Sequence, residues 1–175
     1  MTQIRPLTAA DVDAVVAVHM SGWRTAYKGI IADEILNGLD PAAWTARYHR
    51  ELELRAAGEA PWQTLVCLDE AGEPQGHVNF GPWRADPDGI DPDIGEILSI
   101  YVAEHVYGRG HAAALLEAAL EALPQREVRL WVLEENHRAR RFYEKHGLRP
   151  DGTRELWTPR GATVSYPEIR YSVLR

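Results

Sequence analysis

The chain has 175 residues and a formal net charge of −7, from 19 Lys and Arg against 26 Asp and Glu. This length is typical of one domain with a sizeable core, so we expect a single domain over residues 1–175. The acidic balance argues against a nucleic-acid partner, which would need clustered basic residues for its phosphates. The single cysteine excludes a disulfide framework and a multi-cysteine metal site. No apolar run approaches the roughly 20 residues that span a bilayer, and the first residues show no secretory pattern, so we expect a cytoplasmic protein without a membrane partner.

The first third of the chain predicts one strand followed by helices. Thr8, with Asp11 three residues later, is a short variant of the capping box, and from Val12 the apolar positions recur at the helical period. Pro41, directly after Asp40, suits the first turn of a further helix. The predicted elements are a strand over residues 3–7, a helix from residue 12 that ends at Gly29, helices over 33–39 and 41–57, and a break at 58–61.

The rest of the chain alternates between strands and helices. The clearest buried strand covers residues 96–102, where Glu96 and Ser99 are the polar positions. Residues 81–92 are rich in Asp, Pro and Gly, so we expect a loop there. The other predicted elements are strands over 63–68, 76–80 and 128–133, helices over 110–123 and 137–146, and an antiparallel pair within 154–174. This order indicates an α/β or α+β fold around one sheet.

The segment after the buried strand carries the strongest functional signal. Gly108-Arg109-Gly110 opens a helix, and small residues at 108, 110, 112 and 113 allow a ligand to approach the backbone closely. The first N–H groups of a helix have no intrahelical partners, and the helix dipole adds positive charge there. The segment therefore predicts an anion site suited to phosphate or pyrophosphate. The alternative is a tight strand-to-helix turn without a ligand.

Two established phosphate motifs do not fit this segment. The chain has no GxxxxGK[ST], and residues 108–112 do not give GxGxxG. The acidic ribose partner would have to be Glu127, which opens a strand rather than ending one. A nucleotide-binding fold that uses the turn remains an alternative, and it predicts that ATP or NAD raises the Tm more than CoA does.

Two motifs resemble those of the GNAT acyl-CoA N-acyltransferases. Residues 107–112, YGRGHA, are similar to the family signature [QR]xxGx[GA] at Gly110 and Ala112, although Tyr107 stands where Gln or Arg is usual. The segment LWVLEENHRARRFYEKHGLRPDG resembles the second family motif, with Asn136 before a helix that carries Tyr143. The opening segment HMSGWRTAYKGIIADEIL also resembles a GNAT subgroup, so the resemblance covers nearly the whole chain. It implies a mixed, mostly antiparallel sheet that is flanked by helices and splayed at its central strands.

The resemblance also implies an enzyme, an N-acetyltransferase without a metal. Acetyl-CoA would be the acyl donor, and a primary amine would attack it directly in a ternary complex. Tyr143 would be the general acid for the departing thiolate, and Glu96 the general base, directly or through water. Without the family motif, a core tyrosine is the favoured interpretation of Tyr143, and a solvated carboxylate at the start of the strand is the alternative for Glu96. Strand alternation places Glu96 on one face with Leu98, Ile100 and Val102.

The same resemblance implies the contacts to acetyl-CoA. Backbone groups of the buried strand would meet the pantetheine arm where the strands splay. Asn136 would contact CoA while also capping its helix. Arg109 would pair with a phosphate, or would simply be solvated. The implied donor-binding residues are Ile100, Tyr101, Val102, Tyr107, Gly108, Arg109, Gly110, His111, Ala112, Ala113, Asn136 and Tyr143.

Four aromatic residues are candidates for the acceptor side: Trp23, Tyr27, Trp83 and Trp131. Aromatic faces suit cationic amines, although core packing explains the same residues. The acceptor, a small molecule or a peptide, is cationic if the surplus acids surround its cleft. We expect His19 to be a core histidine and Cys67 a small buried hydrophobe.

Two further expectations concern the activity and the assembly. The rival to the enzyme is a catalytically weak, GNAT-like sensor or interaction module that binds acyl-CoA without turnover. Many family members pair through their sheets or carboxy-terminal strands, and the aromatic tail with Trp157, Tyr166 and Tyr171 is compatible with a homodimer.

Overall fold

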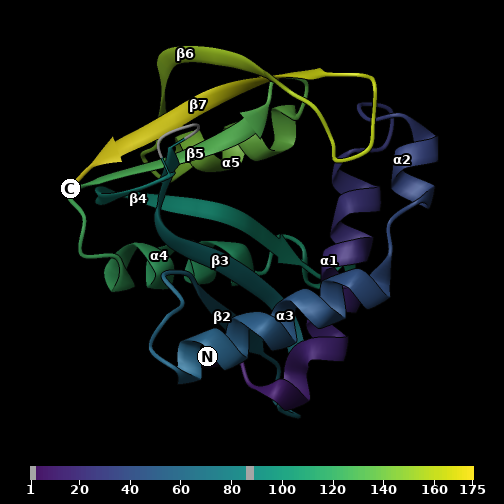
Figure 1. The fold of residues 1–175 in the computed structure, drawn as a ribbon, viewed down its shortest axis with the longest axis vertical. Helices are drawn as coiled ribbons and strands as arrows, with labels where there is room; N and C mark the ends of the chain where they lie inside the picture. Colours follow the sequence, from purple (N-terminus) through teal and green to yellow (C-terminus); the bar gives the residue numbers. More distant parts are fainter. Residues whose placement is uncertain (1–2, 86–88) are drawn as a thin grey trace.

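The computed structural model describes residues 3–85 and 89–175 and shows one seven-stranded sheet with helices on both faces (Figure 1). The strands are β1 (Gln3–Pro6), β2 (Gln63–Leu68), β3 (Pro74–Ala85), β4 (Gly89–Val102), β5 (Glu127–Leu133), β6 (Arg149–Trp157) and β7 (Tyr166–Leu174). The helices are α1 (Val12–Ala26), α2 (Asp33–Asn37), α3 (Pro41–Ala56), α4 (His111–Ala122) and α5 (His137–Lys145), with short 3-10 helices η1 (Ala9–Asp11) and η2 (Glu104–Val106). The strand order is β1-β2-β3-β4-β5-β7-β6, and only the β4–β5 pair is parallel among the described strands. The expected mixed, mostly antiparallel sheet is confirmed.

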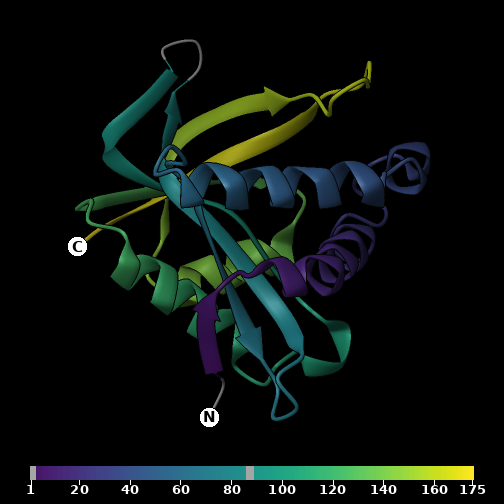
Figure 2. The same ribbon diagram turned by 60° about the horizontal axis from the view of Figure 1, so that its bottom comes forward.

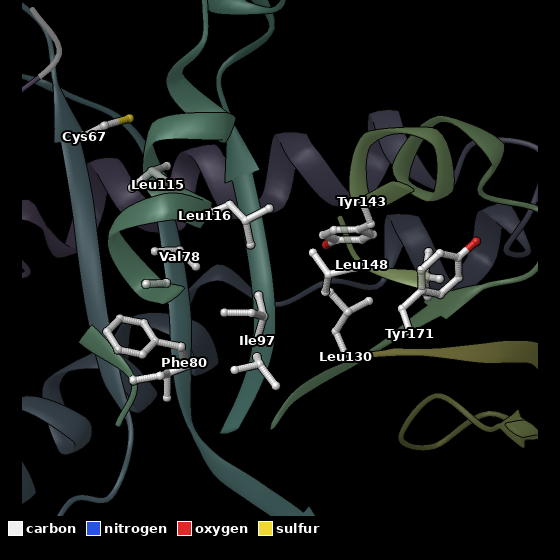
Figure 3. Packing of buried hydrophobic residues seen from close by; sticks show 14 residues of the cluster. Cys67, Val78, Phe80, Ile97, Leu115, Leu116, Leu130, Tyr143, Leu148 and Tyr171 are labelled. Carbon is white, nitrogen blue, oxygen red and sulfur yellow. The ribbon is translucent and has the colours of Figure 1, made fainter. Parts of the chain in front are cut away.

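Each face of the sheet has its own core. On one face, Leu115 of α4 and Tyr143 of α5 belong to the same buried cluster as Ile97 of β4 (Figure 3). On the other face, Val15 of α1 and Tyr48 of α3 pack against β2. Figure 2 shows α3 crossing the sheet on the side opposite α4. The sheet is therefore the middle of three layers, and both of its faces are covered.

The β4 and β5 strands separate partway along their length. Residues 94–96 pair with residues 127–129, and the described pairing between these strands stops there. Beyond this point β4 stays paired with β3 as far as Val102, and β5 stays paired with β7 as far as Leu133. The two halves of the sheet diverge, as Figure 1 shows. The splay at the central strands is confirmed, and it leaves strand-edge backbone groups facing a gap in the sheet.

An extra residue in β4 changes which side chains share a face. Ser99 and Ile97 pair with consecutive residues of β3, which leaves Leu98 without a partner in that strand. A bulge of this kind shifts the inside–outside alternation by one residue. As a result, Ser99 lines the same cleft as Glu96, whereas Ile100 packs against the core on the α4 side. The prediction that residues 96, 98, 100 and 102 share one face is therefore wrong beyond the bulge.

The loop expected over residues 81–92 is also wrong, because most of it belongs to a long hairpin. Arg84 pairs with Ile90, and β4 already begins at Gly89. Residues 86–88 of the expected loop lie outside the described residues. Pro92 is tolerated because residues 92–94 have no partner in β3, so no ladder N–H is needed there.

The helix starts follow the predicted capping signals. The Thr8 backbone N–H donates to the Asp11 carboxylate at 2.8 Å, and Asp40 accepts from the Ala42 N–H at 2.9 Å. The helix ends fall one to three residues before the expected ones. The final antiparallel pair begins earlier than expected, at Arg149, with an irregular register before residue 154. Boundaries of this kind depend on tertiary pairing more than on local pattern.

Candidate active site

A cleft of about 1110 Å³ opens on the α1 side of the sheet. Its aromatic lining consists of His19, Trp23, Tyr27, Trp44, Tyr101, Trp131 and Trp157. Its charged lining consists of Asp40, Arg47, Arg84, Glu96, Glu155, Arg160 and Glu168. These side chains come from helices α1 and α3, from strands β3 to β7 and from the adjoining loops. An aromatic body with a few placed polar groups is typical of small-molecule sites.

Glu96 lies at the point where β4 and β5 part, and its side chain is buried. Arg84 on the neighbouring strand holds this carboxylate, with Nη2 at 2.6 Å from Oε1 and the backbone N–H donating to Oε2 at 3.0 Å. The Arg84 guanidinium is itself half exposed to the cleft side. Glu96 is therefore no solvated carboxylate; it is a buried anion whose positive partner has been supplied by β3.

Tyr143 projects from α5 into the core beside Leu148 and Tyr171 (Figure 3). Burial raises the pKa of its phenol, and the nearby Tyr27 adds to the effect. Among the described residues, no hydrogen bond to the Tyr143 hydroxyl is found. Tyr143 is thus a buried, protonated phenol with an unused donor, lying on the opposite side of the sheet opening from most of the cleft residues.

Tyr27 and Tyr101 connect α1 to β4. Their hydroxyl oxygens are 3.1 Å apart, and burial raises the pKa of both phenols. Tyr101 can lie against α1 only because residue 22 is glycine, since a Cβ at Gly22 would stand 2.5 Å from the Tyr101 ring. Tyr101 was expected as a backbone contact to the donor, and its side chain also forms part of the cleft wall.

The glycine turn before α4 has the geometry that an anion site needs. Gly108 and Gly110 have φ of 74° and 87°, a left-handed conformation that other residues rarely adopt. Gly110 is the N-cap of α4, so the first N–H groups of the helix, at His111, Ala112 and Ala113, have no helical acceptor. A Cβ built at either glycine contacts nothing, so the backbone, rather than packing, requires glycine there. The residues present therefore fit a phosphate group, and Arg109 is exposed beside them.

Tyr107, which departs from the family signature, has a basic partner from another motif. The Arg138 guanidinium lies 3.9 Å from the centre of the Tyr107 ring, within cation–π range. Arg138 belongs to the first turn of α5, next to the N-cap Asn136, whose side chain accepts from the Ala139 N–H at 3.1 Å. The expected capping role of Asn136 is confirmed. Arg138 of α5 therefore places a positive charge beside position 107, where the family signature has Gln or Arg.

The four expected acceptor aromatics divide into two groups. Trp23, Tyr27 and Trp131 line the cleft, and Trp23 and Tyr27 meet edge to face with ring centres 5.0 Å apart. Trp83 is buried behind Trp131 at 6.2 Å and is absent from the described cleft lining. Its ring is flanked by the Arg129 guanidinium at 5.6 Å. Its described contacts are therefore packing contacts within the sheet.

His19 is buried as expected, but it has a polar partner that the sequence pattern did not indicate. Its Nδ1 lies 3.1 Å from Nε2 of His77, which is fully buried in β3. Burial lowers the pKa of both rings, that of His77 to about 3, so both are neutral near pH 7. The outer nitrogens, Nε2 of His19 and Nδ1 of His77, are buried and have no described partner. Cys67 is buried in β2 as expected, and burial raises the pKa of its thiol to about 11.

Glu155 and Glu168 form the second feature that the sequence did not indicate. They are direct register partners on β6 and β7, and both line the cleft. Burial of Glu168, together with its hydrogen bond to Glu155, raises the pKa of Glu168 to about 8. In the sequence these two residues stand in an alternating segment with no motif around them, and only the pairing of the strands brings them together.

Within residues 3–85 and 89–175, no group of three His, Cys, Asp or Glu side chains is arranged to hold a metal ion. In the same ranges, no helix combines the length and the apolar character that crossing a membrane requires. Tyr171 of the aromatic tail is buried in the core, while Trp157 and Tyr166 pack against Trp23 and its neighbours.

Comparisons with known proteins agree with the geometry. Residues 31–148 match the model of the acetyltransferase (GNAT) family. The Mycobacterium tuberculosis protein named "Probable N-acetyltransferase Rv2775" is 32% identical over 99% of this chain and 94% of its own length. The PaiA N-acetyltransferase of Thermoplasma acidophilum in complex with coenzyme A has a TM-score of 0.76 at 17% identity, covering 100% of this chain and 99% of the other. YncA of Salmonella typhimurium with acetyl-CoA has a TM-score of 0.69 at 16% identity, covering 99% and 94%. With a family match over more than half of its length and a relative aligned along almost all of it, the chain belongs to the acetyltransferase (GNAT) family.

Proposed function

We propose that this protein is an N-acetyltransferase that moves an acetyl group from acetyl-CoA to a primary amine, which attacks directly in a ternary complex. The observation that carries the proposal is the gap between β4 and β5. It has the glycine turn of α4 at one end and opens beside Glu96 at the base of the aromatic cleft. One protein can therefore hold the donor and the acceptor on opposite sides of the same opening.

The donor is held mainly by backbone. The free N–H groups at the start of α4 bind the pyrophosphate, and the unpaired edge of residues 100–102 in β4 binds the pantetheine arm. Arg138 and Arg109 add positive charge, and Asn136 orients the turn before α5. The neighbours with CoA and acetyl-CoA bound support this assignment. When bound, acetyl-CoA supplies the activated acyl thioester.

Glu96 is the general base of the proposal. Both of its oxygens already accept bonds from Arg84, so a water molecule is the natural carrier of the proton from the attacking amine. Arg84 keeps the carboxylate charged although it is buried, because a buried charge is retained only when it is paired. The Glu96 carboxylate is then available in each turnover to take up the proton that the acceptor amine loses.

Tyr143 is the general acid of the proposal. Its phenol stays protonated over the physiological pH range because burial raises its pKa. A neutral phenol without another described partner can donate to the departing thiolate. Catalysis of this kind contributes about 10²- to 10⁴-fold.

The test is a thiol-release assay with acetyl-CoA and a panel of primary amines. Turnover with at least one amine is expected. In the Glu96→Gln variant kcat should fall by about 10²-fold or more and its pH profile should shift, while KM for acetyl-CoA stays unchanged. An unchanged pH profile would remove Glu96 from the mechanism.

The rival function is an acyl-CoA sensor or interaction module. It predicts tight acetyl-CoA binding by calorimetry with no turnover on any amine. The pairing of Glu96 with Arg84 and the presence of Tyr143 favour the enzyme, since a binding module needs neither group.

A further inference from the structure

The cleft holds one carboxylate pair for which no ion pair is found among the described residues, although Arg84 lies near enough to lower the pKa of Glu168. Glu155 and Glu168 stand directly opposite each other on β6 and β7, where like charges repel. Glu168 is only 9% exposed, and the side chain that hydrogen-bonds to it is another acid, Glu155. Glu96, the other buried acid of the cleft, differs because Arg84 satisfies it.

The basic residues that flank this pair in sequence are engaged elsewhere. Arg154, next to Glu155, bonds to Glu134 at 2.6 Å, and Arg170, two residues after Glu168, bonds to Asp151 at 2.6 Å. The arginines nearest to the pair in sequence therefore form ion pairs with acids other than Glu155 and Glu168, and neither arginine forms an ion pair with the cleft carboxylates.

The groups that face Glu168 come from every element around it. Glu155 on β6 and Glu96 on β4 are acidic, Arg84 on β3 is basic, and the Tyr27 phenol lies at the end of α1. The two acids and burial raise the pKa of Glu168 to about 8, and Arg84 alone acts in the other direction. Near pH 7 the pair therefore shares one proton, which an entering cation would displace.

A second buried polar residue that lines the cleft also has an atom without a described partner. His19 lines the cleft, is 1% exposed, and has its Nε2 without a described partner. Because Nδ1 of His19 faces His77 at 3.1 Å, Nε2 points away from that ring. Each neutral imidazole has one N–H and one lone pair, so the mutual bond always leaves one group unused on each outer nitrogen. The outer nitrogen of His19 therefore carries either an unused N–H or an unused lone pair, according to the tautomer.

Aromatic rings separate the histidine from the carboxylate pair. Trp23 lies between Tyr27, at 5.0 Å, and Trp157, at 6.0 Å between ring centres. Trp157 itself follows Glu155 by two residues and lines the cleft. Rings in this position pack against alkyl chains and attract ammonium groups.

We propose that the acceptor carries a second, cationic amino group besides the one that is acetylated, and that Glu155 and Glu168 bind this second group. The substrate class is thus a diamine or longer polyamine, with its alkyl chain against Trp23 and Trp157. The second ammonium donates to the two carboxylates, and the proton that they share leaves to solvent. The reacting amine must be neutral to attack, so a pair of anions suits the amine that stays charged. This inference rests on the proposed acetyltransferase function and specifies its acceptor.

The first test compares three acceptors of equal chain length: 1,4-diaminobutane, 4-amino-1-butanol and 1-aminobutane. In the thiol-release assay, kcat/KM should favour the diamine by about 10-fold over the other two, mainly through KM, as expected for charge-assisted bonds. Glu155→Gln and Glu168→Gln should each reduce the preference to about 2-fold while leaving 1-aminobutane nearly unaffected. The control Glu53→Gln changes an exposed acid on the outer side of α3 and should keep the wild-type preference.

The second test separates binding from structural damage. The Glu155→Gln variant lacks one charge of the like-charged pair, so its Tm at pH 9 should equal or exceed that of the wild type. The same variant should bind 1,4-diaminobutane more weakly. Calorimetric titration with 1,4-diaminobutane at pH 7 in two buffers of different ionisation enthalpy should report proton release in the wild type and less in the variant.

The outcomes distinguish the two proposals. Equal efficiency with all three acceptors, or an unchanged preference in both glutamine variants, overturns the diamine inference while leaving the acetyltransferase intact. No turnover on any amine overturns the proposed function. The assignment of the second ammonium to Glu155 and Glu168 is overturned if 1,4-diaminobutane binds without proton release. It is also overturned if the Glu155→Gln variant binds 1,4-diaminobutane as tightly as the wild type.

Discussion

In the proposed site, the donor half, from the β4–β5 splay to the start of α4, is built mainly from backbone groups, whereas the acceptor half is built from side chains. The donor half occupies one short stretch of the chain. The acceptor half gathers side chains from α1, α3, β3, β6 and β7. Backbone donors tolerate changes of side chain, so Tyr107 can replace the usual Gln or Arg. Side-chain sites change with each substitution, which suits the half that selects the acceptor.

The two buried acids of the acceptor half, Glu96 and Glu168, differ in the partners that they have. Glu96 is paired with Arg84, whose guanidinium holds both of its carboxylate oxygens. Glu168 is paired with another acid and so carries a charge that depends on what enters the cleft. A residue that acts in every turnover benefits from the first arrangement, and a residue that recognises a cation benefits from the second.

The largest effect is expected at the junction of the two halves. Tyr143→Phe removes the buried phenol hydroxyl while keeping the ring in its core position, so kcat should fall by about 10²-fold or more. KM for acetyl-CoA and the Tm should change little, because no described protein group bonds to that hydroxyl. Steady-state kinetics with a saturating amine measure the effect. Wild-type kcat in this variant would remove Tyr143 from the chemistry.

A smaller effect is expected in the donor half, where backbone does most of the binding. Arg138→Gln removes the guanidinium beside Tyr107, and KM for acetyl-CoA should rise about 2- to 5-fold, as expected for a partly exposed charge. The increase should shrink at high salt. Arg141→Gln, on an exposed position of the same helix, is the matched control. If both variants behave alike, the charge near Tyr107 has no particular role.

The smallest effect concerns the pH dependence of folding stability that His77, beneath the cleft, contributes. The pKa of His77 is lowered to about 3 by burial, so between that value and its ordinary value of 6.5 the unfolded chain binds a proton that the folded chain does not. Stability should therefore rise with pH across this window and be lost as the pH falls through it.

Replacement of His77 by Gln should reduce that slope by up to about one proton. Chemical denaturation at several pH values between 4 and 7 measures it. A parallel slope in wild type and variant would mean that His77 is protonated in the folded protein. Asp11, held at a pKa of about 2 by its bond to Arg5, acts in the same direction at lower pH and is present in both proteins.

Much of the fold and the donor half could be predicted from local pattern. The capping residues Thr8, Asp40 and Asn136 mark helix starts, and the Gly108–Gly110 turn marks the proposed anion site, because each depends on contacts within a few residues. The hairpin within residues 81–92 could not be predicted, since Pro92 is accommodated by a stretch without partners in β3 that only the register creates. The same holds for the bulge at Leu98, which puts Ser99 on the face of Glu96.

The sequence by itself determined the family, the helix starts and the backbone cradle, because these follow from short-range spacing of glycine, capping and apolar residues. Only the tertiary structure decided the partners of the buried polar groups. Arg84 and Glu96 pair between the two strands of a hairpin. His77 of β3 contacts His19 of α1, and Glu155 faces Glu168 because of the register between β6 and β7. Such pairings join residues that are far apart in the chain, so their spacing leaves no local trace. The acidic surplus seen in the composition acquires a definite place only at that last pair, where two facing carboxylates line the cleft and, in the described part of the chain, neither forms an ion pair.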